Sequence, residues 1–205
     1  MAAQGIVAQE FERQLQESIG VKERLLAQTG ACVDVAQVLI AAYRAGNALF
    51  VFGNGGSAAD AQHIAAEFLG RFYIERPPLA AHALTVNTSA LTAIANDYSF
   101  DEVFARQLRA LGKRGDVALG ISTSGNAANV VRALEAAHET GMTSVALTGS
   151  RGGRAKEVAD YWVGVPSDDT PRIQEAHITI GHIWSALVES ALFGELAQAE
   201  ISAKG

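Results

Sequence analysis

Hydrophobic and polar residues follow two different patterns along the chain. In the first 46 residues, apolar positions recur at roughly helical spacing, and the stretch GACVDVAQVLIAAYRAG continues this pattern until a glycine ends it. The apolar positions before that stretch are Phe11, Leu15, Ile19, Leu25 and Leu26. We therefore predict helices over residues 1–46, as an oligomerisation element of a single-domain protein.

After residue 46, short apolar runs alternate with helical patterns. Strands that are apolar on both faces and separated by helices are typical of a parallel sheet covered on both sides. The runs cover residues 48–53, 82–86, 116–122, 143–149 and 161–165. We predict an α/β fold over residues 47–205, a three-layer αβα sandwich with a five-stranded parallel sheet. A long helix from about residue 172 to 197 follows the last strand.

Composition narrows the class of protein. The chain has 205 residues, of which 49% are hydrophobic and 19% charged, which fits one globular domain. A formal net charge of −6 argues against nucleic-acid or anionic-membrane partners. The single cysteine, Cys32, excludes an intrachain disulfide and fits a reducing compartment. No secretory signal and no membrane-spanning stretch is visible, so we expect a cytoplasmic protein.

Three of the predicted strands end in loops that suit a ligand: GNGGS, STSGN and TGSRGG. Ligands of open parallel sheets bind outside the carboxyl ends of the strands. The first loop opens a helix, whose N-terminus favours anions, but it matches neither the dinucleotide fingerprint nor the Walker loop. An ordinary glycine-rich turn remains the alternative reading for this loop.

The second loop carries three consecutive hydroxyl side chains, Ser122, Thr123 and Ser124, in front of a predicted helix. Hydroxyl groups and free helix N–H groups together hold a phosphate without needing a lysine. A helix N-cap would need only one of the three. We therefore favour a phosphate site over a simple cap.

Two segments carry candidate acid–base or metal-binding side chains. His63 and Glu67 are four residues apart in a predicted helix, so they share one face and suit either a surface ion pair or two zinc ligands. Gln174, His177 and His182 follow one another in the last helix, and the apolar run ITIGHIWSALV predicts that His182 is buried. Either histidine could equally be a satisfied core or surface residue.

Four stretches taken together, GNGGSAADAQHIAAEF, TAIANDY, GDVALGISTSGN and RIQEAHITIGH, resemble the sugar isomerase (SIS) domain family, and within it the phosphoheptose isomerases. The resemblance runs from about residue 10 to 194. It implies a flavodoxin- or Rossmann-like sandwich and a homotetramer with active sites at subunit interfaces. It also implies one zinc ion per subunit, and conversion of sedoheptulose 7-phosphate to D-glycero-D-manno-heptose 7-phosphate for cell-surface polysaccharide such as lipopolysaccharide.

The resemblance also implies roles for individual residues. Glu67 and His182 match the catalytic pair, and the matching metal ligands are His63, Glu67, Gln174 and His182. The positions that match substrate contacts are Asn54, Gly55, Gly56, Ser57, Glu67, Asn96, Asp97, Ser122, Thr123, Ser124 and Gln174. The chain departs from the family at Ala127, where a serine is frequent, so one phosphate hydroxyl is missing.

Spacing and resemblance differ on the partner of Gln174. Eight residues of helix separate Gln174 from His182, a rise of about 12 Å, so spacing alone favours His177 as its neighbour. The resemblance favours His182, and we follow it.

The expected reaction is an aldose–ketose isomerisation through an enediol(ate), with Glu67 as the base and His182 as an acid–base group. Two non-enzymatic alternatives share the fold. One is a non-catalytic tetramer that binds the replication initiator protein, and the other is a sugar-phosphate-sensing module fused to a DNA-binding region. Neither needs an acid–base pair, so the presence of Glu67 and His182 favours an enzyme.

Overall fold

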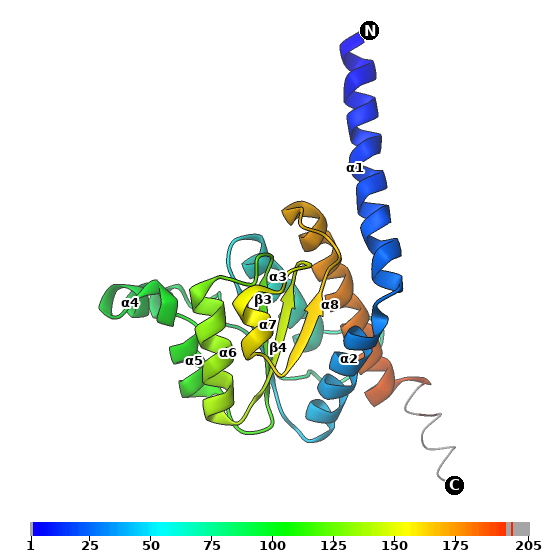
Figure 1. Ribbon diagram of the computed structural model, residues 1–205. Helices are drawn as coiled ribbons and strands as arrows, with labels where there is room; N and C mark the ends of the chain where they lie inside the picture. Colours follow the sequence, from blue (N-terminus) through cyan, green and yellow to red (C-terminus); the bar gives the residue numbers. More distant parts are fainter. Residues whose placement is uncertain (1, 196–197, 199–205) are drawn as a thin grey trace.

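The computed structural model describes residues 2–195 and 198, and Figure 1 shows a sheet between two layers of helices with one long helix projecting from it. The predicted N-terminal helical region is two helices, α1 (Ala2–Leu26) and α2 (Thr29–Arg44). The remaining helices are α3 (Gly56–Leu69), α4 (Thr88–Asp97), the short 3-10 helix η1 (Phe100–Glu102), α5 (Ala105–Leu111), α6 (Ala128–Thr140), α7 (Gly153–Val158) and α8 (Thr170–Phe193).

The predicted five-stranded parallel sheet is confirmed. Its strands are β1 (Leu49–Gly53), β2 (Ala81–Ala83), β3 (Val117–Ser122), β4 (Thr143–Thr148) and β5 (Tyr161–Gly164). All neighbours pair in parallel, in the order β2-β1-β3-β4-β5. The chain therefore leaves β1 toward one edge of the sheet and returns to the other side of β1, which makes the gap between β1 and β3 the point where the order reverses.

Alternate residues of the central strands pack into two separate hydrophobic cores, one on each face of the sheet. In β1, Leu49 and Val51 pack with α2, α3 and α8, whereas Phe50 and Phe52 pack with α5, α6 and α7. All five residues of β1 and all six of β3 are buried. Burial on both faces explains why these strands read as continuous apolar runs rather than as alternating ones.

Two predicted elements differ from the structure by three or more residues at one end. The second strand was expected over residues 82–86 but spans only Ala81–Ala83, because Asn87 already caps α4 by accepting the N–H of Ala90. The last helix was expected to reach residue 197, but α8 ends at Phe193, followed by Gly194 as its C-cap. Residues 196 and 197 lie outside the described residues.

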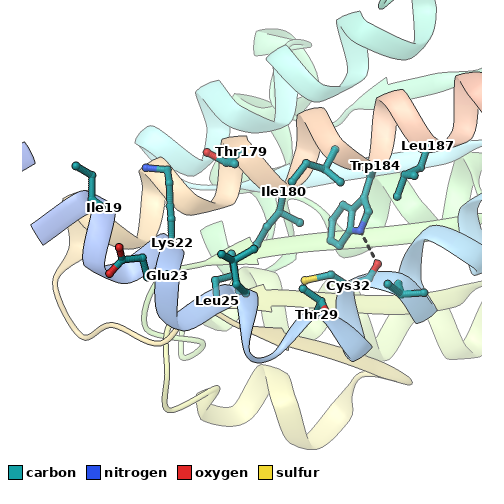
Figure 2. A pocket seen from close by; sticks show the side chains of 13 residues that line it. Ile19, Lys22, Glu23, Leu25, Thr29, Cys32, Thr179, Ile180, Trp184 and Leu187 are labelled. Carbon is teal, nitrogen blue, oxygen red and sulfur yellow. Dashed lines mark hydrogen bonds between the residues drawn. The ribbon is translucent and has the colours of Figure 1, made fainter. Parts of the chain in front are cut away.

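Helix α1 carries apolar side chains that the described chain does not cover. In Figure 1 it extends well beyond the sandwich, and the exposed apolar side chains on it are Ile6, Val7, Phe11, Leu15, Ile19 and Leu26. At its base an apolar groove of about 360 Å³ lies between the α1–α2 junction and α8. Figure 2 shows this groove, with the indole N–H of Trp184 donating to the carbonyl of Cys32 (2.8 Å) beside it.

No single helix of the described residues is both long and apolar enough to cross a membrane. Helices α1 and α2 reach that length and hydropathy only together, and a bend of 73° separates them.

Candidate active site

Three side chains that could hold a metal ion converge from two helices. Helix α3 carries His63 and Glu67, and α8 carries His182. The Nε2 of His63 lies 3.0 Å from Oε1 of Glu67 and 3.3 Å from Nε2 of His182. One ligand atom from each of the three lies within 4.8 Å of the others. The sequence predicted the first pair from spacing, and the fold adds the third residue from 119 positions away.

The spacing of these atoms fits a zinc site. Zn–N distances of about 2.0–2.1 Å at tetrahedral angles place neighbouring ligand atoms about 3.3 Å apart. The two separations at Nε2 of His63 are close to that value. Two imidazoles and a carboxylate are also a common zinc donor set. The residues present can therefore hold the ion that the resemblance implies.

Helices α3 and α8 approach closely because two glycines lack side chains. A Cβ on Gly181 would collide with Ile64 of α3, and a Cβ on Gly56 would collide with the amide of Gln174. The side chain of Gln174 thus contacts the start of α3. His182, about two turns further along α8, lies beside His63. Gln174 is the fourth expected metal ligand, and its backbone remains about 12 Å along the helix from His182.

The glycine-rich loop after β1 is joined to the start of α6. Asn54 and Asn129 exchange two amide hydrogen bonds, of 2.8 and 2.9 Å. Gly55 has a positive φ of 56°, which a residue with a side chain rarely adopts. Ser57 is buried, while Gly55 and Gly56 are exposed. Asn129 was not singled out in the sequence, because its hydrogen bonds to Asn54 join residues 75 positions apart.

The three hydroxyl residues after β3 have different surroundings. Ser122 is buried, and its Oγ accepts the N–H of Gly125 at 3.1 Å, so it closes the turn. Thr123 and Ser124 line a pocket of about 220 Å³. The other residues around this pocket are Asn126, Ser150, Arg151, Asp168, Thr170 and Ile173.

Helix α6 begins beside this pocket without a side-chain cap. Its N-cap residue is Ala127, where the resemblance led us to expect serine, and this residue makes no side-chain capping hydrogen bond. The uncapped helix start leaves backbone N–H groups available for an anion.

Asn96 and Asp97 lie apart from the other expected site residues. Both are exposed at the end of α4, which has no buried residue and extends away from the sandwich (Figure 1). The amide of Asn96 donates to Oδ1 of Asp97 at 2.8 Å. Within the described chain, no hydrogen bond links either side chain to His63, Glu67 or His182.

The prediction that His182 is buried is wrong. His182 is only partly buried, and its ring lies edge-on to that of His63, with centroids 4.9 Å apart. The buried histidine is His177, which is 0% exposed and whose Nε2–H donates to the carbonyl of Thr148 at 3.1 Å. The two residues are five positions apart, so they lie on different faces of α8. The apolar run indicated a buried histidine but not which one.

Comparison with known proteins assigns the fold to a family. The sequence profile of the SIS domain matches residues 14–149, which is more than half of the chain. The chain belongs to the SIS domain family.

Relatives within the SIS domain family are similar over nearly their whole length. A phosphoheptose isomerase from Aneurinibacillus thermoaerophilus is 53% identical over 87% of this chain and 92% of its own length. One from Clostridium acetobutylicum is 50% identical over 90% of this chain and 96% of its own. The structure of a phosphoheptose isomerase from Neisseria gonorrhoeae superposes with a TM-score of 0.85, at 44% identity, over 90% of this chain and 99% of that one.

In this SIS domain, the arrangement separates two kinds of chemistry. The cluster on α3 and α8 offers a carboxylate and two imidazoles that can move protons or hold a metal ion. The pocket after β3 offers hydroxyl groups and a helix N-terminus that can hold an anion. A substrate with a reacting carbonyl at one end and a phosphate at the other suits such a pair of sites.

His177 makes the stability of the protein sensitive to acid. Burial lowers the pKa of His177 to about 4, and the hydrogen bond to Thr148 only partly offsets that effect. Since the unfolded chain takes up this proton near pH 6.5, stability should be complete above that pH and fall between pH 6.5 and 4, by at most about 3 kcal/mol.

Urea unfolding at pH 7, 6 and 5, with a chelator present, measures this loss. The His177→Gln variant should show a shallower fall because it has no proton to bind. Equal acid sensitivity in both proteins would contradict the assignment of His177 as a neutral buried group.

Proposed function

We propose that this protein is a phosphoheptose isomerase that converts sedoheptulose 7-phosphate to D-glycero-D-manno-heptose 7-phosphate. The observation that carries the proposal is the convergence of His63, Glu67 and His182 between α3 and α8, in a chain that also carries a hydroxyl-lined pocket after β3. Relatives at about 50% identity that bear this name, matched over nearly their full length, support the same reaction.

The reaction moves a proton between neighbouring carbons. Glu67 takes the proton from C1 of the ketose and returns it to C2, so that the carbonyl moves from C2 to C1 through an enediol(ate). His182 carries the matching proton from the oxygen on C1 to the oxygen on C2. Glu67 is suited to this work because its side chain is mostly buried yet lies within contact of His63.

We assign zinc to His63, Glu67 and His182, the three side chains that converge. Gln174 is the fourth expected ligand, and its amide, which lies beside Gly56 at the start of α3, would have to move toward the cluster to join them. When bound there, zinc would polarise the sugar oxygens as a Lewis acid. At the other end, Thr123, Ser124 and the start of α6 hold the non-reacting phosphate, whose binding energy orients the reacting carbons. Ser122 supports that loop from within through its bond to Gly125.

The sugar contacts expected from Asn96 and Asp97 require a second subunit in this proposal. Because this pair is exposed on the projecting α4, it can complete the site of a neighbouring copy. We propose a homotetramer, in which the apolar side of α1 and the groove of Figure 2 are covered by other copies of this chain. Residues 1–46 then form the oligomerisation element of the single domain.

We place the reaction in the cytoplasm, as a step toward heptose units of a cell-surface polysaccharide. The alternative, a non-catalytic tetramer that binds the replication initiator protein, has no support among the relatives reported above. A binding protein also has no use for the cluster of His63, Glu67 and His182.

Replacing Glu67 by Gln should abolish most turnover without unfolding the protein. The change is nearly isosteric but removes the base and a charged metal ligand, so kcat should fall by about 10²–10⁴-fold or more. His182→Gln should have a similar effect, and the double variant should be little worse than either single one. The measurement is aldose formation from sedoheptulose 7-phosphate by NMR, with metal content by mass spectrometry.

His177→Gln is the matched control, since His177 is a histidine of the same helix outside the cluster. It should stay active. If it alone were inactive, or if Glu67→Gln kept near-full activity, the assignment of the catalytic pair would be wrong. Absence of aldose from the unmodified protein would contradict the proposed function itself.

Replacing Ser124 by Ala should mainly raise KM. The hydroxyl contacts a phosphate that does not react, so its loss weakens the ground state and the transition state equally. The reverse change at the same loop, Ala127→Ser, adds a hydroxyl and should tighten binding by at most about 1.5–3 kcal/mol. A large fall in kcat of Ser124→Ala at constant KM would show that the loop takes part in the chemistry.

Light scattering at micromolar concentration should give the mass of a tetramer. Replacing two exposed apolar residues of α1, Phe11 and Leu15, by Glu should shift the mass toward smaller species, because charges would then have to be buried. The matched control is Gln9→Glu, an exposed polar position that faces away from Phe11 and Leu15 on the same helix. A mass of about 21.5 kDa for the unmodified chain would contradict the tetramer.

A further inference from the structure

A buried arginine completes the helix that carries His63 and Glu67. The last carbonyl groups of a helix have no partner within the helix. The guanidinium of Arg76 supplies partners at the end of α3: Nη2 donates to the carbonyl of Glu67 at 2.8 Å, and Nη1 donates to that of Phe68 at 2.9 Å. Its positive charge also suits the negative end of the helix dipole. Arg76 therefore fixes the backbone of Glu67.

Arg76 is held in turn by Glu189 of α8. The two side chains form an ion pair of 2.9 Å and are only 1% and 2% exposed. Glu189 also accepts the backbone N–H groups of Phe72, Tyr73 and Ile74, at 2.9, 2.5 and 2.8 Å. Burial by itself would raise the pKa of Glu189, but these donors and Arg76 hold it below its ordinary value, so the carboxylate is charged.

The segment held in this way reaches the other half of the cluster. The ring of Phe72 lies 5.6 Å from the ring of His182, centroid to centroid, with a tilt of 34°. Because Glu189 lies seven residues, or two helical turns, after His182, both residues occupy the same side of α8. The segment from Gly70 to Pro77 is thus fastened to α8 at Glu189 and lies against it again at His182.

We propose that the Glu189–Arg76 pair is a positioning device for the catalytic cluster, fixing Glu67 through its backbone carbonyl and His182 through the ring of Phe72. This role deepens the proposed function and rests on it. In this proposal Arg76 and Glu189 are positioning residues, and Phe72 restricts the rotation of the His182 ring.

The choice of an ion pair supports positioning over stability alone. A buried ion pair is seldom more stabilising than apolar side chains of the same volume, because both charges lose their hydration. Arginine presents several N–H groups in a rigid plane, which sets the direction of every bond it makes. Here that plane meets the carboxylate of Glu189 and four backbone carbonyl groups, those of Glu67, Phe68, Gly70 and Pro77.

The test is Arg76→Lys, which keeps the charge but loses the planar set of donors. The matched control is Arg71→Lys, since Arg71 is 60% exposed in the same segment and forms an exposed ion pair with Glu75, at 3.7 Å. Folding is followed by circular dichroism. Zinc affinity is measured by competition with a chromophoric chelator in the absence of substrate, and kcat and KM are measured with sedoheptulose 7-phosphate well below the melting temperature.

For folded Arg76→Lys we expect zinc affinity and kcat to fall by about 10–100-fold, as is usual when an outer partner of a metal ligand is lost. KM should change little, because the proposed phosphate pocket follows β3 and does not include the segment that holds Arg76. Arg71→Lys should match the unmodified protein. If Arg76→Lys folds with unchanged zinc affinity and kcat, the pair is only structural and the proposal is overturned.

Phe72→Leu decides the matter if Arg76→Lys does not fold. It keeps the backbone bonds to Glu189 and removes only the ring beside His182, so zinc affinity and kcat should each fall by about 2–10-fold. Unmodified values of both would overturn the proposal. An unmodified protein that binds zinc but forms no aldose would contradict the proposed function instead, while the zinc measurements would still test the positioning.

Discussion

The parallel pairing of β1 with β3 is the constraint on which the rest of the site depends. It opposes Gly53 and Ile121 in register, so the loops that follow the two strands start side by side. The strands approach so closely that a Cβ on Gly53 would collide with the carbonyl of Ile121 and with Ser57. The amide exchange between Asn54 and Asn129 then joins the two loops. The glycine-rich turn and the hydroxyl loop therefore lie side by side at the carboxyl ends of β1 and β3.

The second requirement is the close parallel course of α3 and α8. Gly56 and Gly181 allow it by leaving room for side chains of the other helix. His63 and His182, which are far apart in the sequence, then lie next to each other in space. The buried ion pair of Arg76 and Glu189 connects the end of α3 to α8. The two glycines allow the helices to lie close together, and the ion pair holds the C-terminal end of α3 against α8.

The anion loop and the acid–base cluster divide the work of handling a phosphosugar. In the proposed reaction, neutral hydroxyl and N–H groups hold one end of the substrate, and they need no charge of their own because the helix start supplies a partial one. The other end meets groups that exchange protons. The apolar side of α1 and the Asn96–Asp97 pair on α4 are both exposed in the described part of the chain.

The sequence by itself determined the five parallel strands, the hydroxyl loop and the His63–Glu67 pair, because each is formed by residues that lie close together in the chain. His182 came only from resemblance to a family, and the apolar run around it pointed to the wrong histidine as buried. Tertiary structure alone decided the parts that join distant segments, namely Asn129 against the first loop and Arg76 with Glu189 beneath the cluster. These contacts join residues that are 75 and 113 positions apart, so no local pattern in the sequence predicts them.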